Sequence, residues 1–241
     1  LNSVGGDFKA KLFKINQADF KVPDSVTAIS DYAFYACRSM TDVTIPEIYP
    51  FFAEGNSIHP AVVVAPGGGY SYLSWEHEGI DICRWLQKNG FTAFLLKYRC
   101  PGRRLAARAD MARAIRLIRS RAAEFKIDPR KIGVIGFSAG GHLAASASTL
   151  WIDQVTRPDF SILVYPVITM EIGVTHKGTR ERLIKESAVW NHHLADKYSL
   201  QKQVTRFTPK TFIALCSDDK VVPAENSLMY YNALIDHDVP V

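Results

Sequence analysis

Short apolar runs alternate with longer amphipathic stretches from residue 61 to the end of the chain. Runs rich in β-branched residues and bounded by turn residues predict buried strands, whereas apolar positions at helical spacing predict helices. The expected strands lie in AVVVA, FTAFLLKY, IDPRKIGVIG, FSILVYPVI and TFIALC. The expected helices lie in GIDICRWLQKNG, in the arginine-rich segment before IDPRK, from Ser138 to about Leu150, and in VPAENSLMYYNALIDHD. This alternation predicts an α/β fold with a mostly parallel sheet and helices on both faces.

Two parts of the chain lack this alternation. Residues 166–208 are polar and less periodic, which predicts an insertion that forms a lid or part of a site. Residues 1–57 also differ, so we divide the chain into an N-terminal segment, 1–57, and a main α/β domain, 58–241.

One further strand is expected after the turn around DHDVPV, where the chain stops. We therefore expect a truncated domain that lacks its last strand, with an exposed sheet edge that favours self-association.

The N-terminal segment contains a stretch with its own pattern. Residues 22–46 resemble one unit of the BspA-like leucine-rich repeats, through V-T-x-I, A-F-x-x-C and M-T-x-V-T-I-P. A single repeat cannot bury its own apolar face, because about three are needed for a stable array. We expect it either to end a longer array or to pack against the main domain. SMTDVTIPEIYP fits an edge strand of the main sheet equally well.

Composition narrows the class of protein. With 241 residues, 47% of them hydrophobic and 22% charged, the chain is expected to form one large globular core. No run approaches the roughly 18 apolar residues of a membrane span, and the first residues lack a signal-peptide pattern. The net charge of +5 is concentrated in an arginine-rich helix without interleaved aromatic residues, which favours a solvated helix face over a nucleic-acid site. The four cysteines show no metal-type spacing.

The segment GFSAG, residues 136–140, has the spacing of a nucleophile elbow. In this motif, glycines permit a strained turn from strand to helix that exposes the hydroxyl of the central serine, here Ser138. The alternative is that Ser138 only caps the following helix. A strand before the motif, an alanine-rich helix after it, and a second glycine motif earlier in the chain favour the catalytic role.

That second motif, PGGGY at residues 66–70, follows the first expected strand. Three glycines allow backbone N–H groups to approach a substrate oxygen without side chains in the way. Gly68 and Gly69, together with the N–H of Ala139, are the predicted oxyanion-hole donors. A simple tight turn is the alternative.

An acid is expected after a later strand, in the chain order Ser, Asp, His. SDDKVVP offers Asp218 and Asp219, and Asp219 fits the D-x-x-V-P spacing, with Asp218 left to the turn. The alternative is that these aspartates only cap the helix near Pro223. The base is harder to place, because His237 is the one histidine after Asp219 and stands at the end of a predicted helix. We expect His237 to be a surface turn residue, and His142 to pack beneath the glycines.

With these motifs, residues from about 58 to 241 resemble the α/β-hydrolase superfamily, and within it the bacterial acetylxylan and feruloyl esterases. The resemblance rests on VVVAPGGGYSYLSWEHEG, GFSAGGHLAAS, LVYPVITM, THKGTRERLI and FIALCSDDKVVPAENS. It implies a Ser-Asp-His triad with Ser138 and Asp219, no metal and no organic cofactor. It also implies a histidine in a G-G-H-G type segment, which this sequence does not contain.

The predicted function is that of a serine carboxylesterase acting on acylated xylan-type polysaccharide or small acyl esters. One alternative is a catalytically impaired hydrolase fold that serves as a binding or interaction module. Another is a serine peptidase or amidase, because the elbow and the glycine turn serve any acyl transfer. Nucleic acid and membrane are not expected partners. The resemblance implies a secreted or periplasmic protein.

Overall fold

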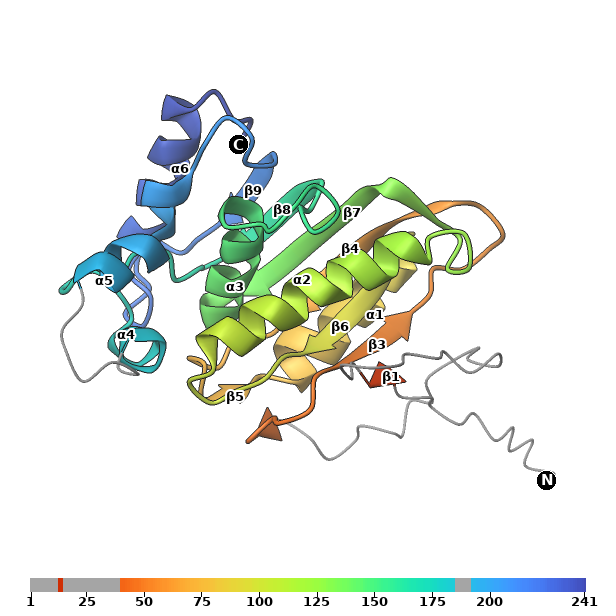
Figure 1. Cartoon of the computed structure of the whole chain (residues 1–241), viewed down its shortest axis with the longest axis horizontal. Helices are drawn as coiled ribbons and strands as arrows, with labels where there is room; N and C mark the ends of the chain where they lie inside the picture. The colour runs from red at the N-terminus through yellow and green to blue at the C-terminus, as the bar shows by residue number, and fades with distance from the viewer. Residues whose placement is uncertain (1–12, 15–39, 185–191) are drawn as a thin grey trace.

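Five parallel strands form the centre of the main sheet in the computed structural model, which describes residues 13–14, 40–184 and 192–241 (Figure 1). Their order across the sheet is β6-β4-β7-β8-β9. They are β4 (His59–Ala65), β6 (Thr92–Lys97), β7 (Ile127–Phe137), β8 (Phe160–Val164) and β9 (Thr211–Ala214). All five strands expected from the apolar runs are present, and the α/β fold class is confirmed.

The order of the strands determines where the helices lie. The chain steps from β4 outward to β6, and then returns across β4 to β7 and continues to β8 and β9. Right-handed crossovers in opposite directions place their helices on opposite faces. Accordingly α1 (Asp81–Lys88) packs on one face, whereas α2 (Arg104–Ser120) and α3 (Ser138–Thr149) lie together on the other (Figure 1). The reversal occurs between β4 and β7, and ligands of open α/β sheets bind at such a switch point.

Two short antiparallel strands extend the sheet beside β6. Strand β3 (Glu47–Phe51) pairs with β6, and β1 (Phe13–Lys14) pairs with β3. Part of SMTDVTIPEIYP therefore belongs to the main sheet, one of the two alternatives for that stretch. A separate pair joins β2 (Met40–Thr41) to β5 (Tyr72–Leu73). Residues 22–39 of the repeat-like stretch lie outside the described residues.

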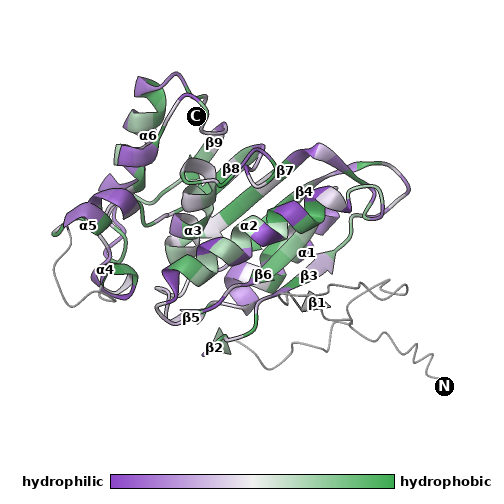
Figure 2. Cartoon of the chain, in the orientation of Figure 1, coloured by the Kyte–Doolittle hydropathy of each residue, from purple (hydrophilic) through white to green (hydrophobic). Residues whose placement is uncertain are grey.

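The core explains the continuous apolar runs. The side chains of Val62, Val63 and Val64 in β4 are fully buried, because helices cover both faces of the parallel sheet. Figure 2 shows the resulting hydrophobic centre with polar helix surfaces around it. In α2, an apolar stripe of Met111, Ala114, Ile115 and Ile118 is also fully buried.

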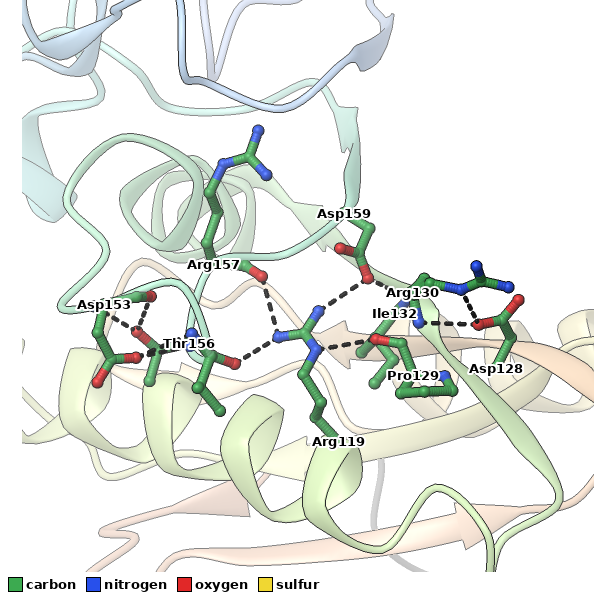
Figure 3. Close-up of polar contacts among 10 residues, drawn as sticks. Arg119, Asp128, Pro129, Arg130, Ile132, Asp153, Thr156, Arg157 and Asp159 are labelled. Carbon is green, nitrogen blue, oxygen red and sulfur yellow. Dashed lines mark hydrogen bonds and ion pairs between the residues drawn. The ribbon is translucent and has the colours of Figure 1, made fainter.

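Arg119 of α2 makes several hydrogen bonds to other segments, whereas a solvated helix face predicts few. Arg119 donates hydrogen bonds from Nε to Pro129 O at 2.9 Å and from Nη2 to Asp159 Oδ2 at 2.8 Å (Figure 3). Its Nη1 donates to the carbonyls of Val155 and Arg157. These bonds tie the end of α2 to the segments that enter β7 and β8, so this part of the basic excess is structural.

The predicted insertion, residues 166–208, contributes short helices beside β8 and β9. These are α4 (Lys177–Ile184), α5 (His192–Tyr198) and the 3₁₀ helix η2 (Leu200–Gln203). They lie with α6 (Glu225–Asp236) at the side of the sheet away from β1 and β3 (Figure 1). Leu200 N–H donates to Ile168 O at 3.0 Å, which anchors η2 to the loop after β8. No helix in the described part of the chain is both long and apolar enough to span a membrane.

Candidate active site

The corner between β7 and α3 holds Ser138 in a strained conformation. Its φ is +51°, a region that residues with a Cβ rarely occupy. The glycines on either side permit the turn, since a Cβ at Gly136 would lie 2.2 Å from Gly140 O, and one at Gly140 would lie 2.1 Å from Ala65 O. Helix α3 has no side-chain cap hydrogen bond, which argues against a purely capping role for Ser138. No described residue hydrogen-bonds to its hydroxyl, and the side chain is partly exposed.

The glycine turn, residues 66–70, lies directly beside this corner. A Cβ at Gly67 would be 3.1 Å from Ser138 Cβ, so the two motifs are in contact. Gly68 and Gly69 have φ of +127° and +64°, and a Cβ at Gly68 would lie 2.1 Å from Tyr72 O. Within the described chain, the N–H groups of Gly68, Gly69 and Ala139 have no acceptor. Free donors next to a serine are what an oxyanion hole requires.

Buried aromatic side chains support the glycine turn from below. The Tyr70 hydroxyl contacts His142 Nδ1 at 3.1 Å, and His142 Nε2 contacts the Tyr198 carbonyl at 2.9 Å. Since a carbonyl only accepts, Nε2 carries the proton and Nδ1 accepts from Tyr70. Burial lowers the pKa of His142 to about 4. His142 is thus a neutral structural residue beneath the glycines, as predicted. The Tyr98 hydroxyl also supports the turn, because it donates a hydrogen bond to Pro66 O at 2.7 Å.

The loop between β9 and α6 distinguishes the two aspartates. Asp219 is half-buried, and its Oδ1 accepts hydrogen bonds from Val221 N at 2.8 Å and Val222 N at 3.0 Å. No described residue donates to its Oδ2, which leaves one oxygen able to orient a base. Asp218 is exposed and accepts from the Cys216 thiol at 2.9 Å. This arrangement favours Asp219 over Asp218 as the acid.

Tyr165, at the end of β8, connects the acid to the serine corner. Its ring lies 6.0 Å, between centroids, from that of Phe137, the residue before Ser138. Burial raises the pKa of the Tyr165 phenol, and the negative charges of Glu78 and Asp219 raise it further. The charge of Asp219 therefore affects the Tyr165 phenol, whose ring packs against the residue before Ser138. Tyr165 has a φ of +37°, so its backbone, like that of Ser138, lies in the left-handed region that non-glycine residues rarely adopt.

The seven histidines all lie in described segments, and none hydrogen-bonds to Ser138 or Asp219. His237 is exposed at the end of α6, where Nδ1 contacts Ala233 O at 2.8 Å. His77 pairs with Asp81 at 3.6 Å, and His59 Nδ1 contacts Gly90 O at 3.1 Å. His176 contacts Thr179 Oγ1 at 2.9 Å. In the part of the chain that the structure describes, no histidine therefore bridges Ser138 and Asp219.

Sequence reasoning missed several residues of this region. The Glu78 carboxylate accepts a hydrogen bond from Gly67 N at 2.6 Å, and Arg182 Nη1 donates to Gly178 O at 3.0 Å and reaches Gly69 O at 3.5 Å. An acidic residue close after the three glycines was the available signal for Glu78. No group of three or more potential metal ligands occurs among the residues that the structure describes.

A serine on a sharp corner at the carboxyl end of a parallel sheet, beside a turn with free N–H groups, is how α/β-hydrolases arrange a serine nucleophile. The molecule is an α/β-hydrolase. Comparison with known proteins gives the family. The BD-FAE family model matches residues 47–234, and the chain belongs to this family.

Three relatives are informative. An acetylxylan esterase of Xylanibacter ruminicola is 39% identical over 186 residues, covering 76% of this chain and 38% of the relative. Endo-1,4-beta-xylanase B of Butyrivibrio fibrisolvens is 32% identical over 212 residues, covering 81% of this chain and 33% of the relative. The chain thus spans well under half the length of either relative. The crystal structure of an acetyl ester-xyloside bifunctional hydrolase from Caldicellulosiruptor lactoaceticus superposes with a TM-score of 0.79 at 34% identity, covering 96% of this chain and 84% of that one.

Proposed function

We propose that this chain carries the catalytic centre of a serine carboxylesterase that removes acetyl or feruloyl groups from xylan-type polysaccharide or hydrolyses small acyl esters. The observation that carries the proposal is the strained Ser138 corner next to the unpaired N–H groups of Gly68, Gly69 and Ala139. The names of the relatives, an acetylxylan esterase and an acetyl ester-xyloside hydrolase, support an ester of acylated xylan as the substrate.

In the proposed reaction, Ser138 Oγ attacks the ester carbonyl while a base removes its proton. The carbonyl oxygen becomes an oxyanion that accepts hydrogen bonds from the Gly68, Gly69 and Ala139 N–H groups. Each such donor is worth about 3 kcal/mol of transition-state stabilisation, and the N-terminus of α3 also favours the negative charge. The alcohol leaves, and water hydrolyses the acyl-enzyme to regenerate Ser138.

The base must stand between Ser138 Oγ and Asp219 Oδ2. Asp219 would accept the Nδ1–H of a histidine and so hold its other nitrogen toward the serine. The seven histidines of this chain do not occupy that position in the structure. The proposal therefore predicts a site with a working nucleophile and acid that responds to an imidazole supplied from outside.

Chemical rescue tests this directly. The 241-residue chain is assayed with p-nitrophenyl acetate with and without imidazole, and labelling by a fluorophosphonate probe is located by mass spectrometry. We expect saturable rescue and labelling at Ser138. Ser138→Ala should remove both, with a loss on the order of 10⁴-fold or more of any triad-dependent rate, and it also measures the background hydrolysis by imidazole itself.

The neighbouring aspartates provide a matched pair of variants. Asp219→Asn should abolish rescue, because an amide favours the wrong tautomer of the imidazole, whereas Asp218→Asn should retain it. Equal rescue in both variants would remove Asp219 from the mechanism, and unchanged labelling in Ser138→Ala would overturn the proposal. Turnover without imidazole would mean that a histidine of the chain reaches Ser138, and His237→Gln would show whether it is His237. An aminoacyl anilide in parallel separates esterase from amidase activity.

The absence of a histidine beside Ser138 also favours a second candidate, a hydrolase fold that binds acylated xylan fragments without turnover. Calorimetric binding of such fragments, combined with no hydrolysis and no rescue by imidazole, would support this candidate over the esterase.

A further inference from the structure

The Glu78 carboxylate makes a hydrogen bond on each side of the Ser138 corner. Its Oε2 accepts from Gly67 N in the glycine turn at 2.6 Å, and its Oε1 accepts from the Tyr165 hydroxyl at 3.0 Å. The glycine turn follows β4 and Tyr165 follows β8, whereas Ser138 follows β7, which lies between those strands. One side chain therefore connects the two loops that flank the nucleophile.

A local irregularity of the backbone positions the Glu78 side chain between the glycine turn and Tyr165. Residues Glu76–Ile80 form a single turn of π-helix, η1, in which Ile80 N donates to Trp75 O at 2.9 Å. Such turns are rare and occur often at functional sites. Gly79, the residue after Glu78, lies against the core, since a Cβ at this position would be 3.0 Å from Leu95 Cδ1.

The carboxylate is held there against an electrostatic cost. Burial raises the pKa of the Glu78 carboxyl, and the hydrogen bonds from Gly67 and Tyr165 act in the opposite direction. Space is also reserved for it, because a Cβ on residue 67 would come within 2.6 Å of Glu78 Oε2 and 2.8 Å of Phe137 O. A glycine at position 67 thus allows the carboxylate, the glycine turn and the Ser138 corner to meet.

Oxyanion-hole donors are effective only when they are fixed before the reaction. A turn with three consecutive glycines has little conformational preference of its own. Since Gly67 N–H is bonded to Glu78, it is not a donor to substrate, and the next residues, Gly68 and Gly69, present theirs. We propose that Glu78 is a positioning residue for acyl transfer, which rests on the proposed function: its carboxylate clamps the glycine turn and Tyr165 at fixed spacing around Ser138.

Two substitutions separate geometry from charge. Glutamine at 78 can accept from Gly67 N–H through its carbonyl and donate from its amide to the Tyr165 oxygen, so Glu78→Gln keeps both contacts without the charge. Glu78→Ala removes both. Glu76→Ala is a matched control on the same π turn, because the Glu76 side chain makes no hydrogen bond or ion pair with the described residues.

The first readout does not depend on activity. Amide hydrogen exchange, followed by NMR on the 241-residue chain, reports on Gly67, and on Ser71 and Ser74, whose N–H groups donate to Gly68 O and Gly67 O. We expect Glu78→Ala to accelerate exchange at these amides by about tenfold or more. Glu78→Gln and Glu76→Ala should stay within about threefold of the wild type. Exchange in Glu78→Ala equal to that of the wild type, or acceleration in Glu78→Gln as large as in Glu78→Ala, would overturn the proposal.

The second readout is turnover of p-nitrophenyl acetate, with imidazole where it is needed. Glu78→Ala should lower kcat on the order of 10- to 100-fold with KM little changed, because donors that are out of place lose transition-state binding first. Glu78→Gln should retain most of kcat, and a loss in KM alone would contradict the clamp. If the wild type shows no turnover, the proposed function fails, while the exchange measurement still decides the clamp. Should Glu78→Ala not fold, Tyr165→Phe removes one contact and should give a smaller acceleration at the same amides.

Discussion

The amino and carboxyl ends of the central strands differ in how their polar groups are hydrogen-bonded. At the amino ends of β7 and β8, Arg119 donates hydrogen bonds to backbone carbonyls and to Asp159, whose Oδ2 also accepts from Ile132 N at 2.8 Å (Figure 3). At the carboxyl ends, N–H groups of Gly68, Gly69 and Ala139 remain without acceptors in the described chain. The polar groups around Arg119 are bonded to one another, whereas three N–H groups at the carboxyl ends stay unpaired.

Backbone strain occurs at both ends, since Lys126 before β7 has a φ of +53°, but more of it lies around the candidate site. Three of the six described non-glycine residues with positive φ, namely Tyr70, Ser138 and Tyr165, surround the candidate site. Strain of this kind persists only where the surrounding structure holds it in place. The comparison teaches that the bonded end supplies rigidity, whereas the carboxyl end holds the strained and unpaired groups that chemistry requires.

The largest stability effect is expected at the bonded end. Arg119→Ala should lower the free energy of unfolding by roughly 3 to 4 kcal/mol, because the mostly buried Asp159 carboxylate loses its charged partner and keeps only the Ile132 N–H, while several carbonyls lose the guanidinium donor. Arg116→Ala, one turn earlier on α2, breaks an exposed pair with Asp153 and should destabilise the protein far less, because solvent screens the pair. Urea unfolding measures both. Equal losses in the two variants would break the comparison.

The second effect is a pH dependence from the support beneath the glycine turn. Burial lowers the pKa of His142 from 6.5 to about 4. The folded state therefore binds the proton less well than the unfolded state, and stability present above pH 6.5 is lost as pH falls toward 4. The loss approaches about 3 kcal/mol, at roughly 1.4 kcal/mol per pH unit.

Replacement of the ring tests that assignment. In His142→Gln the amide can accept from Tyr70 and donate to the Tyr198 carbonyl, so thermal unfolding should show a flatter loss of stability between pH 6.5 and 4. His237→Gln, at an exposed position, serves as the control and should keep the wild-type slope. A wild-type slope in His142→Gln would assign the pH dependence to other groups.

The smallest effect concerns the strained serine itself. Ser138→Gly should raise the free energy of unfolding by about 1 kcal/mol, because glycine adopts a φ of +51° without steric cost. The same variant removes the nucleophile. Lys126, exposed and with φ of +53°, offers a matched position, and Lys126→Gly should give a similar gain without loss of activity. A destabilised Ser138→Gly would mean that the corner stores no strain.

Much of the fold was predictable because it depends on local patterns. The apolar runs identified all five parallel strands, since strands buried on both faces require continuous apolar sequence. The glycines around Ser138 indicated the corner, because only residues without a Cβ fit where the structure leaves about 2 Å of space. The choice of Asp219 over Asp218 by spacing stays a prediction that the hydrogen bonds of its Oδ1 support.

Contacts between distant segments were not predictable in this way. The sequence did not show that Glu78 would meet Gly67 and Tyr165, which are 11 and 87 positions away, nor that Arg119 would bond the segments that enter β7 and β8. That SMTDVTIPEIYP joins the main sheet was one of two alternatives, and its antiparallel pairing with β6 is known only from the structure.

The sequence by itself determined the strands, the corner and the glycine turn, because backbone sterics and burial act on neighbouring residues. The tertiary structure decided which of these elements lie together. The reversal of strand order at β4 brings the glycine turn beside Ser138 and leaves every histidine of the chain without a bond to either Ser138 or Asp219. The position of each histidine relative to Ser138 and Asp219 depends on crossovers and packing over the whole sheet, and no local sequence pattern encodes it.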